Sequence, residues 1–196
     1  MELTKIAVAR SQLETACSLY FDDGDPVSIH TLVCASHEIL AQLAKENGAT
    51  SLLRDEFRKD IRPGKEKMFL DMLNKSRNFF KHANQNLPKI HNFNPEENEI
   101  IMLDACAMYF KITGEEPFWI WACRGWITLK EPGMFILKEE DRQRIVDLQS
   151  ICSTKKSFIK TFSNFFQKNK SISKTRTLTS DFLVDDTGFE PVTFRM

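Results

Sequence analysis

The chain has 196 residues and lacks the short motifs that mark the common nucleotide-binding and hydrolytic folds. It contains only seven glycines, and none of them belongs to a glycine-rich phosphate loop. There is no GxSxG nucleophile elbow, no HExxH zinc motif and no paired CxxC motif. These absences exclude dehydrogenases, P-loop NTPases, α/β-hydrolases and zincins.

Long apolar runs are also missing. No run approaches the roughly 20 residues that a helix needs to cross a bilayer. The first residues, MELTK, lack the basic and then apolar layout of a signal peptide. Five cysteines are an odd number without a CxxC pair, which favours free thiols in a reducing compartment. We therefore expect a cytoplasmic protein without a membrane span and without a cofactor.

Charge is balanced over the whole chain but unevenly distributed along it. Residues 1–152 carry 19 basic and 23 acidic side chains, a balance of −4. Residues 153–180 carry seven basic and no acidic side chains. Residues 181–196 carry one basic and four acidic side chains. The body is therefore not a basic groove for nucleic acid, and attraction to polyanions is expected mainly after Ser153.

Helical periodicity dominates the apolar pattern, and no alternation typical of strands is present. A first helix would place one apolar face inward, comprising Leu3, Ile6, Ala7, Leu13, Cys17 and Tyr20. Asp25-Pro26 is a strong start for a second helix to about Glu46. Further helices are expected at about 51–59, 65–83, 95–112, 117–129 and 139–168, the last as one helix or two.

These helices predict an all-α fold, a compact bundle of five to seven helices over residues 2–168. Residues 169–196 are rich in Ser, Thr and Lys and then aperiodic, which predicts a disordered tail without function. The last ten residues, TGFEPVTFRM, resemble the peptide obtained when a reading frame runs through a transfer-RNA gene.

The segment Arg77-Asn78-Phe79-Phe80-Lys81-His82 combines residue types that could cleave a phosphodiester without a metal. A histidine can move a proton, and an arginine can hold the negative charge that develops on the phosphate. The alternative is structural: a surface arginine and a histidine that caps the negative end of a helix. Five residues on a straight helix are about 140° apart, so the pair converges only where the helix bends or ends.

The Arg77…His82 spacing resembles the R-x4–6-H signature of the HEPN superfamily, small all-α domains of bacterial toxins and defence ribonucleases. The resemblance implies that His82 acts as general base or general acid, that Arg77 stabilises the phosphate and that Asn78 orients the pair. It also implies a composite site across a symmetric homodimer, RNA or a nucleotide as ligand, and an antitoxin-like protein partner. No metal would be required.

Four further segments resemble landmarks of an uncharacterised bacterial family of cytoplasmic proteins, over about residues 2–140. They are Asp25–Leu32, His37–Leu40, Asn78–Ala83 and Leu103–Cys106. This resemblance implies no established activity.

His30, Cys34 and His37 lie on one stripe of the second helix and are ligand types for zinc. A fourth ligand could come from His82 or Asp104. The two histidines are about two turns, roughly 10 Å, apart, so buried hydrogen-bonded histidines are the competing interpretation. A third possibility is a cleft in which His30, His37 and His82 bind a phosphate together with Arg77 and Lys81.

A non-enzymatic interaction module is the rival functional interpretation. Its dimer surface would be the aromatic cluster around Trp119, Trp121 and Trp126, which otherwise belongs to the core. A second candidate surface is the amphipathic segment after Ser153, where Phe158, Phe162, Phe165 and Phe166 share a helical face. That helix could cover the bundle, lie on an anionic membrane or follow RNA.

Overall fold

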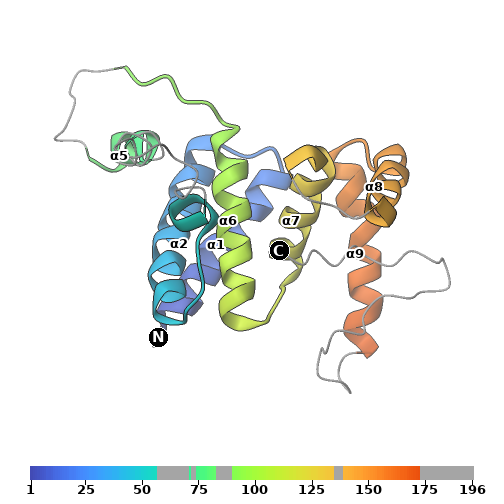
Figure 1. Ribbon diagram of the computed structural model, residues 1–196, viewed down its shortest axis with the longest axis horizontal. Coiled ribbons are helices and arrows are strands. Elements are labelled where there is room, and N and C mark those ends of the chain that lie inside the picture. Colours follow the sequence, from blue (N-terminus) through green and yellow to red (C-terminus); the bar gives the residue numbers. More distant parts are fainter. Residues whose placement is uncertain (57–70, 72–73, 83–89, 135–138, 173–196) are drawn as a thin grey trace. The chain divides into compact units, whose positions relative to one another are not determined.

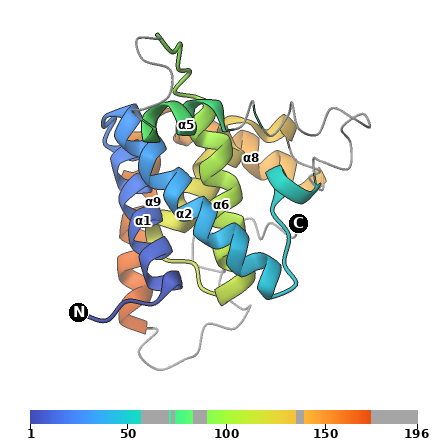
Figure 2. The same ribbon diagram turned by 90° about the vertical axis from the view of Figure 1, so that its left-hand side faces the viewer.

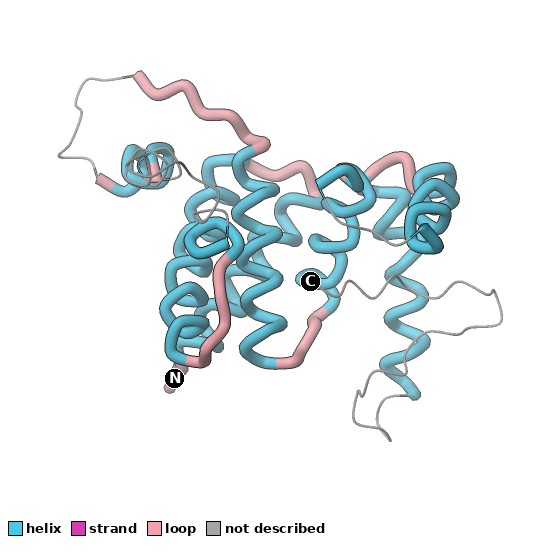
Figure 3. Tube along the Cα trace, in the orientation of Figure 1, coloured by secondary structure: helices cyan, strands magenta, loops and turns pink. Residues whose placement is uncertain are grey.

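A computed structural model of the chain describes residues 1–56, 71, 74–82, 90–134 and 139–172. Within these ranges every regular element is a helix, as the all-α prediction requires (Figures 1 and 3). The elements are α1 (Lys5–Phe21), α2 (Pro26–Glu46), the π-turn η1 (Leu52–Glu56), α5 (Lys75–Lys81), α6 (Glu97–Thr113), α7 (Phe118–Lys130), the 3-10 turn η2 (Pro132–Met134), α8 (Glu139–Ile151) and α9 (Lys155–Ile172).

Local signals set several helix ends. The Asp25 carboxylate accepts a hydrogen bond from the Ser28 N–H at 2.7 Å, and Pro26 opens α2. This helix has the predicted bounds. Gly114 follows α6 in a left-handed conformation with φ 68°, which glycine adopts without strain. The start expected for helix 65–83 lies outside the described residues; α5 is its described part.

The predicted inner face of the first helix is partly wrong. Leu3 is 58% exposed because it precedes the cap residue Thr4 and is not part of α1. Ala7 is also exposed, whereas Ala9 is buried. Residues that are two positions apart in a helix point about 200° apart around its axis, so Ala7 and Ala9 cannot share a face. The buried face of α1 comprises Ala9, Leu13, Ala16, Cys17, Tyr20 and Phe21.

The first compact unit of the chain comprises residues 1–127, and its core lies between α1, α2 and α6. Figures 1 and 2 both show these three helices side by side. The fully buried side chains include Leu13, Val33, Leu40, Met102 and Met108. At about 25 cal/mol per Å² of apolar surface, burial of this kind is the main stabilising contribution.

Trp126 belongs to the core of this unit and is 9% exposed. Its indole Nε1–H donates to the Tyr20 hydroxyl at 3.2 Å, and that hydroxyl donates to Glu99 at 2.8 Å. Trp119 packs near Phe21, with ring centroids 6.0 Å apart. These contacts place Trp126 in the core, whereas Trp119 and Trp121 are half-buried, so the dimer surface stays a prediction.

The chain from residue 128 onward belongs to a second compact unit, of which the structure describes residues 128–134 and 139–172. The expected helical stretch 139–168 is two helices, because α8 ends at Ile151 and α9 begins at Lys155. Gln149 donates to the Leu129 carbonyl at 2.7 Å, and Ile145, Cys152 and Phe158 are buried. Residues 169–172, predicted as part of the tail, are the last residues of α9. The rest of the predicted tail lies outside the described residues.

Among the helices that the structure describes, none is both long and apolar enough to cross a membrane.

Candidate functional site

The Asp104 carboxylate lies at the centre of a buried polar cluster in the first unit. Asp104 is 1% exposed and accepts four hydrogen bonds. The Ser51 hydroxyl donates at 2.6 Å, His37 Nε2 at 2.8 Å, and the N–H groups of Leu52 and Leu53 at 2.8 and 3.2 Å. Asp104 on α6 thus satisfies backbone donors at the start of η1 that have no partner within that turn.

These hydrogen bonds decide the protonation state of Asp104. Burial acts to raise the pKa of its carboxyl, but the hydrogen bonds from His37 and Ser51 and from backbone N–H groups outweigh burial. The pKa of Asp104 is therefore below its ordinary value. The carboxylate stays ionised at neutral pH, and His37 Nε2 must carry a proton to donate to it.

Two arginines meet at one carboxylate beside this cluster. Arg54 from η1 and Arg77 from α5 each place a guanidinium nitrogen 2.6 Å from the same oxygen of Glu38 on α2. The hydrogen bond from Arg54 and then that from Arg77 lower the pKa of Glu38 to about 2, against the opposing effect of burial. Charge-assisted hydrogen bonds of this length are typical of strong anion contacts.

A small open pocket of about 30 Å³ lies at these arginines. Its lining residues are Cys34, His37, Leu53, Arg54, Asn74, Arg77 and Ile101. The pocket brings Arg77 of α5 together with Cys34 and His37 of α2, two of the predicted metal ligands. Its two guanidinium groups and the polar side chains of His37 and Asn74 give it the chemistry of an anion site.

His30 is fully buried and belongs to a complete chain of hydrogen bonds. Its Nδ1 lies 2.8 Å from the Asn98 side-chain oxygen, and the Asn98 amide donates to the Pro26 carbonyl at 3.0 Å. The Cys34 sulfur lies 3.4 Å from His30 Nε2. A neutral ring that donates through Nδ1 and accepts from the thiol satisfies every contact. Burial lowers the pKa of His30, which favours this neutral form.

Aromatic rings surround His30 and connect it to α5. The rings of Phe80 and Phe93 lie edge-to-face on it, with centroids 5.3 and 5.0 Å away. His91 stacks beside Phe79 at 5.0 Å, and its Nε2 lies 2.9 Å from the Ser76 hydroxyl. That hydroxyl donates to Glu97 at 2.7 Å.

His82 follows the last residue of α5 as its C-terminal cap and is half-buried. Its backbone N–H donates to the Asn78 carbonyl at 3.1 Å, and the Asn78 side chain is exposed. In the part of the chain that the structure describes, no hydrogen bond or ion pair joins His82 to Arg77. The catalytic assignment of Arg77, Asn78 and His82 therefore stays a prediction.

The metal prediction for His30, Cys34 and His37 gains no geometric support. His30 and Cys34 contact each other, but His37 is turned to Asp104. Over the described ranges, three ligand atoms of His, Cys, Asp or Glu gather within 4.8 Å only at Cys17, Cys106 and Cys123. Of the residues predicted for a cleft of three histidines, His37 and Arg77 line the pocket, whereas His30 lies in the core. The cleft itself stays a prediction.

The sequence alone does not predict the ion pairs of this region or the place of His91 in it. Glu38 pairs with Arg54, 16 residues away, and with Arg77, 39 residues away, and no local pattern indicates either ion pair. The sequence also gives no prediction for His91, although the apolar Phe93 two residues later is a signal that this segment packs inward. Comparison of this chain with family models, with curated proteins and with solved structures gives no match.

We expect the stability of the protein to fall in two stages as pH decreases. The pKa of His30 is lower in the folded protein than its unfolded value of about 6.5. The unfolded chain therefore binds more protons below pH of about 6.5, and the free energy of unfolding declines there. The pKa of Asp104 is also lowered, so its contribution is lost below about pH 4 as the carboxylate protonates.

Urea denaturation between pH 8 and pH 3 would measure both stages. In His30→Asn the first stage should disappear while the second remains. A constant free energy of unfolding between pH 7 and pH 5 in the wild-type protein would contradict the assignment of a buried neutral His30.

Proposed function

We propose that this chain is a HEPN-like helical domain that binds the phosphate of RNA or of a nucleotide at the pocket between Arg54 and Arg77. The observation that carries the proposal is the convergence of both guanidinium groups on one Glu38 oxygen, each at 2.6 Å. A phosphate oxygen has the charge and the acceptor geometry of that carboxylate oxygen. A phosphate can therefore take its place.

Some of the residues that carry the two resemblances also support the proposal, because they lie at or beside this pocket. His37 and Arg77 line it, and Glu38 lies between its two arginines. Asp104 holds both His37 and the start of η1, the element that presents Arg54. Sequence segments far apart in the chain thus build one polar region.

In the catalytic form of this proposal, the domain is a metal-independent ribonuclease. His82 takes the proton of a ribose 2′-hydroxyl, whose oxygen then attacks the phosphorus. The bond to the 5′-oxygen breaks, and that oxygen receives a proton. Arg77 stabilises the charge on the phosphate, and Asn78 orients the pair. In a symmetric homodimer, His82 of the second copy would complete the site, so that the two residues need not meet within one chain.

The test combines RNA binding and RNA cleavage by the purified full-length protein in EDTA. Arg77→Ala should weaken binding about tenfold or more, the usual effect of losing a charged hydrogen bond. Arg10→Ala is the matched control, because Arg10 on α1 pairs with Glu14 and Glu115 and does not line the pocket. Its affinity for RNA should equal that of the wild type.

His82→Ala separates cleavage from binding. We expect it to bind RNA normally and to cleave at least about 100-fold more slowly, as expected for the loss of a general acid or base. Equal RNA affinity of wild type and Arg77→Ala would exclude the pocket as the binding site. Binding without cleavage in the wild type would identify the domain as an inactive, RNA-binding relative.

A further inference from the structure

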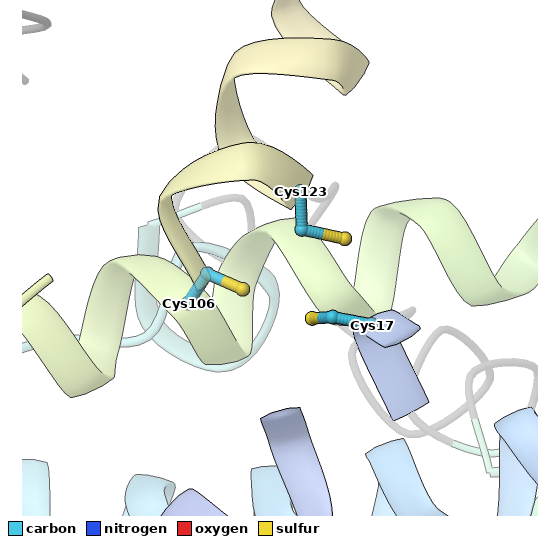
Figure 4. Close-up of side chains that lie close together, drawn as sticks. All are labelled: Cys17, Cys106 and Cys123. Atoms are coloured by element: carbon cyan, nitrogen blue, oxygen red, sulfur yellow. The ribbon is translucent and has the colours of Figure 1, made fainter. Parts of the chain in front are cut away.

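Three cysteines meet in the core of the first unit, away from the arginine pocket. Cys17 of α1, Cys106 of α6 and Cys123 of α7 are fully buried. Their sulfur atoms all lie within 4.8 Å of one another, and all three are free thiols. Figure 4 shows how the three side chains come together from their separate helices.

The geometry suits an ion with three sulfur ligands. Sulfurs no more than 4.8 Å apart leave a common centre at most about 2.8 Å from each. Metal–thiolate bonds of about 2.3 Å require only a slight contraction from that limit. Structural zinc sites have four ligands, and within the described residues no fourth histidine, cysteine or carboxylate joins this group.

Electrostatics narrows the choice of ion. The Arg124 guanidinium lowers the pKa of Cys106, and Arg124 is paired with Glu116. A divalent ion held by three thiolates would add an uncompensated negative charge to a site without solvent exposure, which is costly. A trivalent centre with three thiolates is neutral and adds no charge.

Burial of the three thiols disfavours the charged thiolate form of each of them. Burial raises the pKa of Cys17 and Cys123 well above the ordinary value for a thiol. Burial acts in the same direction on Cys106, but the thiols of Cys123 and Cys17 and the Arg124 guanidinium lower its pKa below the ordinary value.

We propose that Cys17, Cys106 and Cys123 form a binding site for trivalent arsenic, which enters as arsenite. In the reaction As(OH)₃ + 3 RSH → As(SR)₃ + 3 H₂O, three As–O and three S–H bonds break. Three As–S bonds and three molecules of water form. Arsenic stays trivalent, so no oxidant or reductant is needed. Arsenite is uncharged at neutral pH, so it enters the core without the cost of desolvating an ion.

The experiment uses the full-length protein, reduced with a phosphine and incubated with sodium arsenite. After removal of free arsenite, elemental analysis should find one arsenic per chain, and the intact mass should show one arsenic gained and three hydrogens lost. X-ray absorption should show arsenic with three sulfur neighbours and no oxygen neighbour. The thermal midpoint should rise, because the ligand binds the folded state.

Cys123→Ala should lose stoichiometric arsenic, whereas Cys152→Ala should keep it. Cys152 is the matched control because it is also buried but lies outside the cluster. If Cys123→Ala folds poorly by circular dichroism, the sulfur count around arsenic in the wild-type protein decides the question. Absence of bound arsenic, fewer than three sulfur neighbours, or preferential stoichiometric binding of Zn²⁺ in a parallel incubation would overturn the proposal.

Discussion

Replacement of Asp104 by alanine is expected to lower the free energy of unfolding by about 3–5 kcal/mol, the usual effect of removing one partner of a buried charged cluster. The carboxylate satisfies His37, the Ser51 hydroxyl and two backbone N–H groups at once. Without it, all four donors lose their acceptor, three of them in buried residues, and each unsatisfied buried group costs about 1–3 kcal/mol. Partial relaxation keeps the total below their sum.

Asp55 provides a matched control in the same turn. Its carboxylate accepts the Ser51 N–H at 2.8 Å, but Asp55 itself is exposed. Asp55→Ala should cost only about 1 kcal/mol, as for an exposed cap. Asp104→Asn should be intermediate, because the amide keeps one acceptor oxygen but directs its own donors at existing donors. A loss below about 1 kcal/mol in Asp104→Ala, measured by urea denaturation at pH 7, would contradict the central role of this carboxylate.

Replacement of His30 by alanine should lower the free energy of unfolding by about 3 kcal/mol. The ring is fully buried, so its removal leaves a cavity against Phe80 and Phe93. The Asn98 side-chain oxygen loses its donor at the same time, which adds a desolvation cost. Both changes weaken the contacts that His30 of α2 makes with Phe80 of α5 and Asn98 of α6.

Thr31→Ala is the control for His30, because Thr31 is the next residue of α2 and is exposed. Its hydroxyl donates to the Val27 carbonyl of the same helix, a contact of little net value. Thermal and urea denaturation should place this variant within about 0.5 kcal/mol of the wild type. Similar free energies of unfolding for His30→Ala and Thr31→Ala would show that the rings of Phe80 and Phe93 repack into the cavity without cost.

Signals that act over a few residues explain why the helix bounds could be predicted. Asp25 and Pro26 fix the start of α2, and Gly114 follows the end of α6 as a left-handed residue. The sequence does not predict the break at residues 152–154, since one continuous helix and two shorter helices have the same periodicity. The structure places Thr154 before α9, where its hydroxyl accepts the Ser157 N–H at 3.1 Å.

The polar sites depend on pairings across long stretches of chain, which periodicity does not encode. The sequence indicated that His30, Cys34 and His37 share a stripe, but their partners decide their roles. His37 faces Asp104, which is 67 residues away, and His30 faces Asn98. The three clustered cysteines come from three helices, and their 89- and 17-residue spacings resemble no ligand motif.

The pairing of Glu38 with two arginines has a consequence for how the proposed phosphate site works. Because the carboxylate already lies against both guanidinium groups, an incoming phosphate exchanges with an anion that the protein carries itself. Each binding event then releases Glu38 into solvent, and the net gain is the difference between two ion pairs. Strong, oriented contacts of the phosphate with both arginines can prevail in this exchange, whereas a weakly held anion cannot. Glu38 therefore competes with every incoming anion, and this competition favours ligands that bind Arg54 and Arg77 together.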